Sequence, residues 1–293
     1  MASSYAAWLD RLTQAGIREA EQDLRAILHH VLPDIPVLAI DLAALPLAPD
    51  EIDRIEAAVD QRATRIPLER IFGYTEISSL TLEVAGGVHK PYPETEDVIL
   101  KALTLFPDQN LPLRILDIGT GSGVILLGLL KALPYASGIG LDLSPEAIAV
   151  AERNAANSNL ADRAAFRVNN WTHGVKEQFD LVISNPPRVA TADIPHLMPE
   201  MRDHDPLLSL DGGEDGLLFY YRLADDFRRL IKPDGFGCIQ VGARYAEAGT
   251  DILSQKGLHN ITLHTNLVMQ PLLIAYQHKP RLSLWRWLFC TAS

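Results

Sequence analysis

The stretch "ILDIGTGSGVILLGLL" at residues 115–130 reads as a buried strand, a glycine turn and a helix in direct succession. Residues 115–118, which precede the turn, are mostly apolar and suit a strand. The longer apolar run after the turn suits a helix. Gly119, Gly121 and Gly123 allow a tight turn and a close approach of the backbone to a ligand. The N–H groups that begin the next helix favour negative charge. Because α/β proteins also place glycines here for packing alone, the triplet needs support from elsewhere in the chain.

The rest of the chain from residue 113 repeats the same alternation of strand and helix. Short apolar runs predict strands at 114–119, 137–143, 164–168, 179–184 and 236–241, and longer amphipathic or apolar stretches predict helices at 123–133 and 145–157. Strands that alternate with helices indicate βαβ units and a parallel sheet. We therefore expect an α/β fold, with a mostly parallel sheet and helices on both of its faces.

The N-terminal part has a different pattern. Residues 1 to about 66 show helical spacing of apolar side chains on three faces, which are Tyr5, Trp8, Leu9 and Leu12, then Leu24, Ile27, Leu28 and Val31, then Ile52, Ile55 and Val59. These faces predict a small helical bundle without a catalytic constellation. Residues 71–88 are rich in β-branched and aromatic residues around two serines, which predicts a β-hairpin joining the two parts.

Composition restricts the class of protein. The 293 residues suffice for two domains, and 47% hydrophobic and 22% charged residues are ordinary for a soluble globular protein. We find no signal peptide and no run of about 18 apolar residues, so we expect no membrane span. Cys238 and Cys290 are the only cysteines, which excludes a disulfide framework or a cysteine-rich metal site and fits the cytoplasm. The net charge of −11 argues against duplex DNA as a partner.

An acidic residue further along the chain supports a ligand-binding role for the glycine turn. Asp142 lies at the end of the next predicted strand in "GLDLS", 23 residues after Gly119, where a carboxylate commonly binds the ribose hydroxyls of a nucleoside. Asp142 could instead cap the helix that begins near Ser144. The spacing is not the dinucleotide pattern, and Asp117 just before the turn suits an amino-bearing or cationic ligand such as S-adenosylmethionine. Alternatively, Asp117 only hydrogen-bonds the turn.

The motifs "LDIGTGSG", "GLDLS" and Asn185-Pro186-Pro187 occur in the order and spacing of class I S-adenosylmethionine-dependent methyltransferases. More narrowly, the chain resembles the HemK/PrmC-type enzymes that methylate the glutamine side-chain amide of peptide chain release factors. The resemblance covers nearly the whole chain and includes the stretch at 67–84, "PYPETE" at 91–96 and "RDHDPLLSLDGGEDGLLFYYRL" at 202–223. It implies the class I methyltransferase form of the Rossmann-like fold.

The resemblance also implies roles for single residues. An amide nitrogen is a poor nucleophile and needs its N–H groups held, and we expect the Asn185 carbonyl oxygen and the Pro186 backbone carbonyl to accept them. The prolines fix φ and cannot donate, and Pro187 and Arg188 are expected to contact the substrate. Alternatively, the motif only ends a strand. The residues expected to bind the cofactor are Asp117, Gly119, Thr120, Gly121, Gly123, Asp142, Asn170, Trp171 and Asn185.

Three positions depart from the family pattern. Arg188 stands where relatives have an aromatic residue, usually tyrosine, that stacks on the planar substrate group. A guanidinium can also stack, it could pair with an acidic group on another substrate, or the site could be impaired. Asn170 replaces a common aspartate that accepts from the adenine amino group, a bond that its carbonyl oxygen could still form. Tyr92 replaces an arginine.

Together these observations predict four segments: a helical bundle for substrate recognition at 1–70, a hairpin linker at 71–90, a methyltransferase domain at 91–280 and an aromatic tail at 281–293. The leading hypothesis is a monomeric cytoplasmic methyltransferase that uses S-adenosylmethionine and acts on a release factor. One alternative is methylation of another planar nitrogen, in a nucleobase or an acidic small molecule. Another is a cofactor-binding interaction protein without activity.

Overall fold

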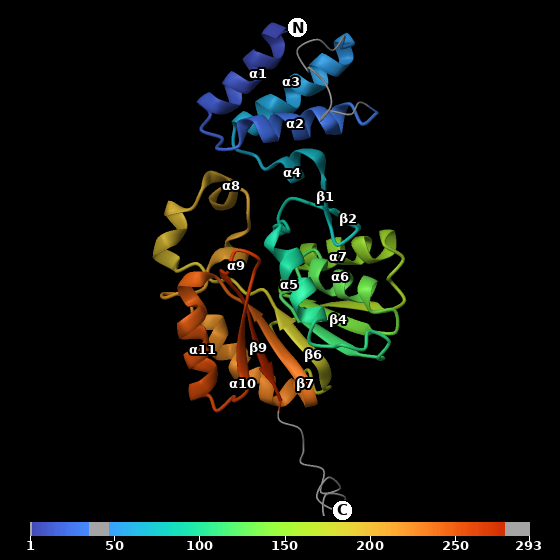
Figure 1. Cartoon of the computed structure of the whole chain (residues 1–293), viewed down its shortest axis with the longest axis vertical. Coiled ribbons are helices and arrows are strands. Elements are labelled where there is room, and N and C mark those ends of the chain that lie inside the picture. Colours follow the sequence, from blue (N-terminus) through green and yellow to red (C-terminus); the bar gives the residue numbers. More distant parts are fainter. Residues whose placement is uncertain (1, 35–46, 279–293) are drawn as a thin grey trace, which may run out of the picture. The chain divides into compact units, whose positions relative to one another are not determined.

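The computed structural model describes residues 2–34 and 47–278, which form two compact units (Figure 1). The first takes its described residues from Met1–Thr75, Val84–Gly86 and Leu197–His204, and the second takes the remainder. The first unit is therefore assembled from three separate segments of the chain. The aromatic tail predicted at 281–293 lies outside the described residues.

The first unit is a helical bundle, as the sequence predicts. Its helices are α1 (Ala2–Gln14), α2 (Ala20–Val31), α3 (Pro49–Ala63) and the short α4 (Leu68–Phe72). The three predicted faces meet in one core, in which Leu12, Leu24, Ile27, Ile55 and Val59 are fully buried. The short segment at 197–204 contributes the helix α8 (Pro199–Arg202) to the same unit.

The predicted β-hairpin is present but shorter than expected. It consists of β1 (Tyr74–Ile77) and β2 (Leu80–Glu83), joined by Ser78 and Ser79. Both serines have positive φ, 51° and 59°, which is the backbone of a two-residue hairpin turn. The first residues of the predicted stretch instead belong to α4, which ends at Gly73 in the left-handed conformation.

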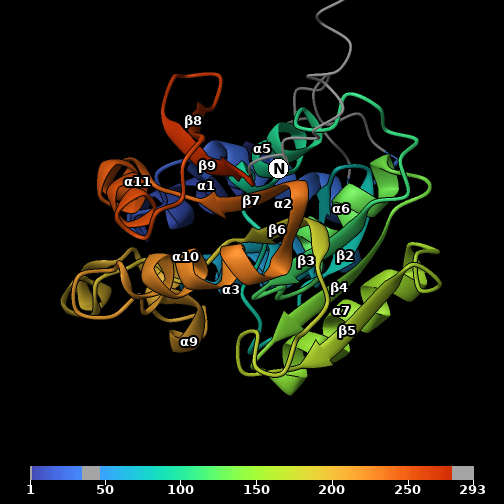
Figure 2. The same ribbon diagram turned by 90° about the horizontal axis from the view of Figure 1, so that it is seen from below.

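The second unit contains a seven-stranded sheet in the described part of the chain, with the order β5-β4-β3-β6-β7-β9-β8 (Figure 2). Its first five strands in the chain run parallel, and β9 and β8 are antiparallel additions at one edge. The strands are β3 (Arg114–Ile118), β4 (Ser137–Asp142), β5 (Ala164–Val168), β6 (Phe179–Ser184), β7 (Ile231–Gln240), β8 (Ile261–Thr265) and β9 (Pro271–Gln277). This confirms the predicted mostly parallel sheet, while β8 and β9 were not predicted.

Helices cover both faces of this sheet, and the central strands β3, β4 and β6 are accordingly buried along most of their length. Along β3, Ile115 belongs to the core on one face and Leu116 to the core on the other. The first core includes residues of α5 (Glu94–Leu103), α6 (Val124–Ala132) and α7 (Pro145–Asn157), and the second includes α10 (Leu218–Leu230) and α11 (Ala246–Gln255). Short helical turns are η2 (Thr191–His196), α9 (Leu207–Leu210) and η3 (Ala243–Tyr245).

The strand order reverses between β3 and β6. From β3 the chain proceeds outward to β4 and β5, and it then returns to place β6 on the other side of β3. The Ser184 hydroxyl donates to the Ile118 carbonyl at 2.7 Å, joining the carboxyl ends of these two strands. In open parallel sheets, ligands bind at the carboxyl ends of the strands beside such a reversal. The glycine turn and Asn-Pro-Pro both follow strands that flank this point. In the described part of the chain, no helix has both the length and the apolar character needed to cross a membrane.

Candidate active site

The glycine turn after β3 is open where a ligand would approach. Gly119 and Gly121 have φ of 73° and 55°, and a Cβ added to either would meet no atom within 4 Å. A Cβ at Gly123 would instead lie 3.2 Å from the side chains of Ala151 and Phe166. The first two glycines therefore leave backbone accessible at the edge of the sheet, while the third permits close packing of α6.

Asp142 ties the end of β4 to this turn. Its Oδ2 accepts the Gly121 N–H at 2.9 Å, and its Oδ1 accepts the Ser144 N–H at 3.0 Å. Ser144, rather than Asp142, caps α7, because its hydroxyl accepts from the Ala147 N–H. A carboxylate has about four acceptor positions. The half-buried carboxylate of Asp142 thus keeps capacity to accept from two further hydroxyl groups.

Asp117 is a buried carboxyl with one unused oxygen. Its Oδ2 accepts from the Thr120 hydroxyl at 2.8 Å, whereas its buried Oδ1 has no hydrogen-bond partner in the described structure. Burial raises the pKa of Asp117 to about 7. Hydrogen bonds from Thr120 and from the Leu126 backbone oppose this rise, and the nearby Asp142 charge adds to it. Asp117 therefore does hydrogen-bond the turn, as one interpretation of the sequence has it. Its second oxygen is not used by the turn, and the other interpretation, a cationic or amino-bearing ligand, stays a prediction.

The residues expected at the adenine end lie beside Asp142. The Asn169 N–H donates to the Asp142 carbonyl at 2.8 Å, which brings the next residue, Asn170, to the same edge of the sheet with an exposed side chain. Trp171 is half-buried, and its ring centroid lies 4.6 Å from that of Phe219. Its ring therefore packs against α10, and any contribution that it makes to cofactor binding has to come from the remaining ring surface or the backbone.

Asn185 follows β6 directly, and it is half-buried beside the buried Pro186. Its Oδ1 already has a partner, because Arg188 Nη1 donates to it at 2.7 Å. The sequence did not predict this bond. A separation of three residues between an amide and a guanidinium is a weak signal, since the intervening prolines are what turn Arg188 back toward Asn185.

A glycine loop supports the backbone around Arg188. A Cβ at Gly212 would lie 2.8 Å from the Arg188 Cα, and one at Gly216 would lie 2.6 Å from the Arg188 carbonyl oxygen. The Val189 N–H donates to the Leu210 carbonyl, and the Gly212 N–H donates to the Val189 carbonyl, at 2.9 and 2.8 Å. This accounts for the "DPLLSLDGG" stretch, since larger residues would displace the segment that carries Asn185.

Tyr92 joins two of the segments that carry the family resemblance. Its hydroxyl donates to Asp205 Oδ2 at 2.9 Å, and His89 Nδ1 lies 3.2 Å from the same oxygen. The Asp205 side chain is completely buried. Tyr92 therefore links "PYPETE" to "DPLLSLDGG", a structural role that explains why a residue other than arginine is accommodated there.

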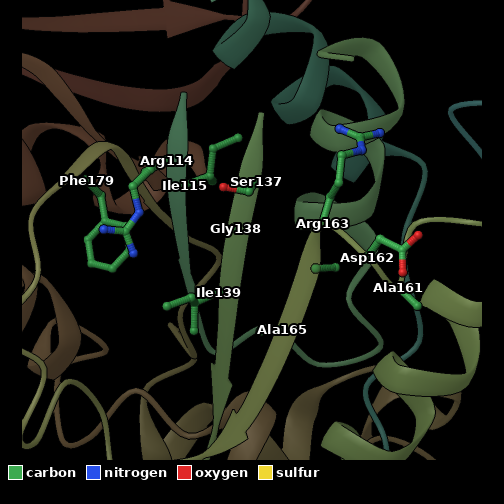
Figure 3. Close-up of a pocket in the computed structure, with 11 residues that line it drawn as sticks. Arg114, Ile115, Ser137, Gly138, Ile139, Ala161, Asp162, Arg163, Ala165 and Phe179 are labelled. Atoms are coloured by element: carbon green, nitrogen blue, oxygen red, sulfur yellow. The ribbon is translucent and has the colours of Figure 1, made fainter. Parts of the chain in front are cut away.

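A separate cavity of about 240 Å³ lies at the ends of the strands opposite to those that carry the candidate site (Figure 3). It is lined by Arg114, Ser137 and Ala164, the first residues of β3, β4 and β5. The Arg163 guanidinium beside it donates to the carbonyls of Leu130, Leu133 and Ala136 at 2.7 to 2.9 Å. The cavity thus lies at the amino ends of these strands, away from the candidate site. Arg163 binds the carbonyl groups at the end of α6.

Two family models match the chain, a "PrmC N-terminal domain" over residues 5–73 and a "Methyltransferase domain" over residues 110–248. A protein of Caulobacter vibrioides named release factor glutamine methyltransferase is 38% identical over 85% of this chain and 86% of its own length. One of the same name from Cereibacter sphaeroides is 36% identical over 91% and 94%. The hMettl16 catalytic domain is similar in fold, with a TM-score of 0.54 at 16% identity over 81% of this chain and 86% of that one.

Proposed function

The chain belongs to the release factor glutamine methyltransferase family, and from this membership we propose that it methylates the glutamine side-chain amide of a peptide chain release factor with S-adenosylmethionine. The observation that carries the proposal is the position of Asn185-Pro186-Pro187, next to the open glycine turn at the reversal of the sheet. An amide acceptor followed by two residues without N–H donors suits a substrate that itself donates N–H.

The residues of the cofactor site fit S-adenosylmethionine. Asp142 would accept from the ribose hydroxyls and Asp117 Oδ1 from the amino group, while Gly119, Thr120 and Gly121 would lie along the cofactor. Gly123 supports this turn by packing, and Asn170, Trp171 and Asn185 complete the proposed set. When bound, S-adenosylmethionine supplies an electrophilic methyl group on a positively charged sulfur.

At the substrate site, the chain orients the nitrogen and offsets the charge that develops on it. The Asn185 carbonyl oxygen accepts one amide N–H, and the Pro186 carbonyl accepts the other. Holding both hydrogens directs the nitrogen lone pair toward the methyl group. The two carbonyl dipoles stabilise positive charge on nitrogen as its delocalisation is lost. Pro187 and Arg188 contact the rest of the planar group.

Further parts of the proposal concern the whole protein. The helical bundle, proposed as residues 1–70, recognises the release factor, and residues 91–280 carry the chemistry, with the linker at 71–90 between them. The protein does not use duplex DNA as its substrate, because its net charge of −11 would repel the phosphate backbone. It acts as a monomer in the cytoplasm, where release factors are found.

The test is methyl transfer from labelled S-adenosylmethionine to purified release factors, with nucleic acid and a metabolite extract as parallel substrates. We expect label in a release factor, and mass spectrometry should place one methyl group on a glutamine side chain. Label in nucleic acid or in a small acidic metabolite, with none in any release factor, would replace the proposed substrate. Cofactor binding without transfer to any of them would indicate a binding protein.

A further inference from the structure

The proposed reaction needs one particular end of the Asn185 side chain. Its amide carries an oxygen that accepts and an NH2 group that donates, and the two ends have nearly the same size. Turned by half a rotation, the half-buried amide would point its own donors at the N–H groups of the substrate. Shape alone does not prevent this rotation, so another group has to determine which end faces the substrate.

Arg188 is the group that distinguishes the two ends. Within the described residues, the side chain of Asn185 forms a single hydrogen bond, in which Arg188 Nη1 donates to Oδ1 at 2.7 Å. A guanidinium has five N–H donors and no acceptor, so it binds the oxygen of an amide and not the nitrogen. The distance is that of a charge-assisted bond, which is roughly twice as strong as a neutral one. The bond therefore favours one orientation of the amide over the other.

This bond leaves Asn185 Oδ1 able to receive the substrate. A carbonyl oxygen has two acceptor positions, of which Arg188 uses one. The second position remains for a substrate N–H. The flat face of the guanidinium and its other donors are not used by Asn185, so the bond is compatible with the contact between Arg188 and the planar group of the substrate.

Arg188 can fix its neighbour because its own position is fixed. Its main chain is enclosed by Gly212 and Gly216, where an added Cβ would lie 2.8 Å from the Arg188 Cα and 2.6 Å from its carbonyl oxygen. A Cβ added to Gly242 would lie 3.8 Å from Arg188 Nε. The guanidinium thus reaches from Gly242, just after β7, to Asn185, just after β6. Because β6 and β7 are paired strands, the guanidinium is positioned against a rigid frame.

We propose that Arg188 is a positioning residue that acts through Asn185: its bond to Oδ1 holds the amide with this oxygen ready to accept the substrate N–H. The inference rests on the proposed function for the identity of the substrate. An acceptor lowers the barrier most when it already points to the place where charge develops, because no reorganisation is then needed during the reaction. The arginine that replaces the family's aromatic residue thereby contributes to the rate as well as to the contact with the substrate.

The first test is made on the free protein and needs no substrate. The side-chain NH2 signal of Asn185 in the nuclear magnetic resonance spectrum is identified by its absence from Asn185→Ala, and relaxation measures its motion on the ps–ns timescale. We expect an ordered amide in the parent and a mobile one in Arg188→Met. Arg244→Met is the matched control, because it removes an exposed guanidinium from η3 that is paired with Asp193, and it should leave the amide ordered. An amide as ordered in Arg188→Met as in the parent would overturn the inference.

The second test measures kcat and KM separately, with labelled S-adenosylmethionine and a release factor. Arg188→Met should lower kcat about threefold to tenfold, which corresponds to the cost of ordering one side chain in the transition state. This loss of kcat should disappear when Asn185→Ala is already present, because no amide remains to be oriented. The loss of direct contact between Arg188 and the substrate should instead raise KM in both backgrounds.

These outcomes separate positioning from a direct role in the reaction. A loss of kcat by Arg188→Met that persists in Asn185→Ala would contradict the inference, because Arg188 would then act on the substrate itself, by stacking or by pairing with an acidic group. An unchanged kcat in Arg188→Met would contradict it as well. If the parent methylates no release factor, the proposed substrate is wrong, while relaxation of the Asn185 amide still decides whether Arg188 orients it.

Discussion

Asn185 is the residue on which the proposed chemistry depends. Asn185→Ala removes the acceptor for one substrate N–H but leaves the glycine turn and Asp142 in place, so methyl transfer should fall by two to three orders of magnitude, roughly the effect of losing one transition-state hydrogen bond. Cofactor affinity should change little. Transfer rates and calorimetric cofactor binding check both expectations. Activity within a few-fold of the parent would mean that Asn-Pro-Pro only ends β6.

Asp142 should determine cofactor affinity rather than stability alone. Asp142→Ala removes a charged acceptor from the proposed ribose site, and affinity measured by calorimetry should fall by about 1.5–3 kcal/mol. Ser144→Ala is a matched control, because it removes the cap of α7 next to Asp142 and should reduce stability by about 1 kcal/mol without weakening cofactor binding. Equal affinity of Asp142→Ala and the parent would remove Asp142 from the site.

Asp117 should make stability depend on pH. Burial raises its pKa to about 7, above the ordinary value of 3.8, so between these values the folded state holds a proton that the unfolded state has lost. The free energy of unfolding therefore decreases as pH rises from about 4 to about 7 and stays lower above that. Asp117→Asn keeps an acceptor for Thr120 but carries no charge, so it should be more stable than the parent at pH 8.

Thermal unfolding of the cofactor-free protein across this range provides the measurement. The melting temperature of Asp117→Asn should exceed that of the parent by several degrees at pH 8, since about 1 kcal/mol corresponds to roughly 2–4 °C for a domain of this size. The difference should shrink as pH falls toward 4. A constant difference across the range would show that the carboxyl does not titrate there.

At the scale of elements, Glu200 holds the short helix α8 within the first unit. Its two oxygens accept from Arg62 at 2.9 Å and Arg65 at 2.7 Å, and Arg62 also donates to Asp23 at 2.7 Å. Burial acts to raise the pKa of Glu200, but the hydrogen bonds from Arg65 and Arg62 outweigh this and hold the pKa below its ordinary value. The ionised carboxylate is therefore the stable form in the folded protein.

Glu200→Gln should destabilise the protein by about 1.5–3 kcal/mol at neutral pH, because Arg65 loses its carboxylate partner and Arg62 keeps only Asp23. Because the folded pKa is lowered, this advantage of the parent exists above about 4.5 and disappears as pH falls below that value. Urea unfolding at pH 7 and at low pH measures the difference. Asp203→Asn at the other end of α8 is the control, as it breaks only an exposed pair with Arg202 and should cost at most about 1 kcal/mol.

At the scale of the whole molecule, the first unit is not a contiguous piece of sequence. A fragment of residues 1–75 lacks Glu200 and also the Ala85 carbonyl, which accepts from Arg70 Nη1 at 2.8 Å in the full chain. Amide hydrogen exchange of α3 should therefore be faster in the fragment than in the full chain, by at least the factor seen for Glu200→Gln. Equal protection in the fragment and the full chain would show that residues 1–75 fold independently of the returning segment.

The pattern of apolar residues determined much of this protein by itself. The spacing of apolar residues predicted the parallel sheet, the bundle and the hairpin. A helix or strand that buries one face, or a strand that buries both, needs apolar side chains at the spacing set by its own backbone geometry. The glycine turn, Asp142 and Asn-Pro-Pro identified candidate site residues, because the ability of a glycine to turn or of a side chain to accept a hydrogen bond is a property of the single residue. β8 was missed because it is short and only partly buried, and it pairs with β9 alone. β9 is buried over most of its length, but a short apolar run does not by itself distinguish a strand from a helix.

The tertiary structure decided which of these residues lie close together and which hydrogen bonds their side chains form within the protein. β3 and β6 became neighbours only through the reversal of the sheet, which places Asn185 beside a turn that lies 62 to 66 positions earlier in the chain. Arg188 could be recognised in the sequence as unusual, but its bond to Asn185 depends on backbone that Gly212 and Gly216 hold from a distant loop. Local periodicity carries no information about such contacts, because they are formed by side chains from different elements once packing has fixed the distance between them.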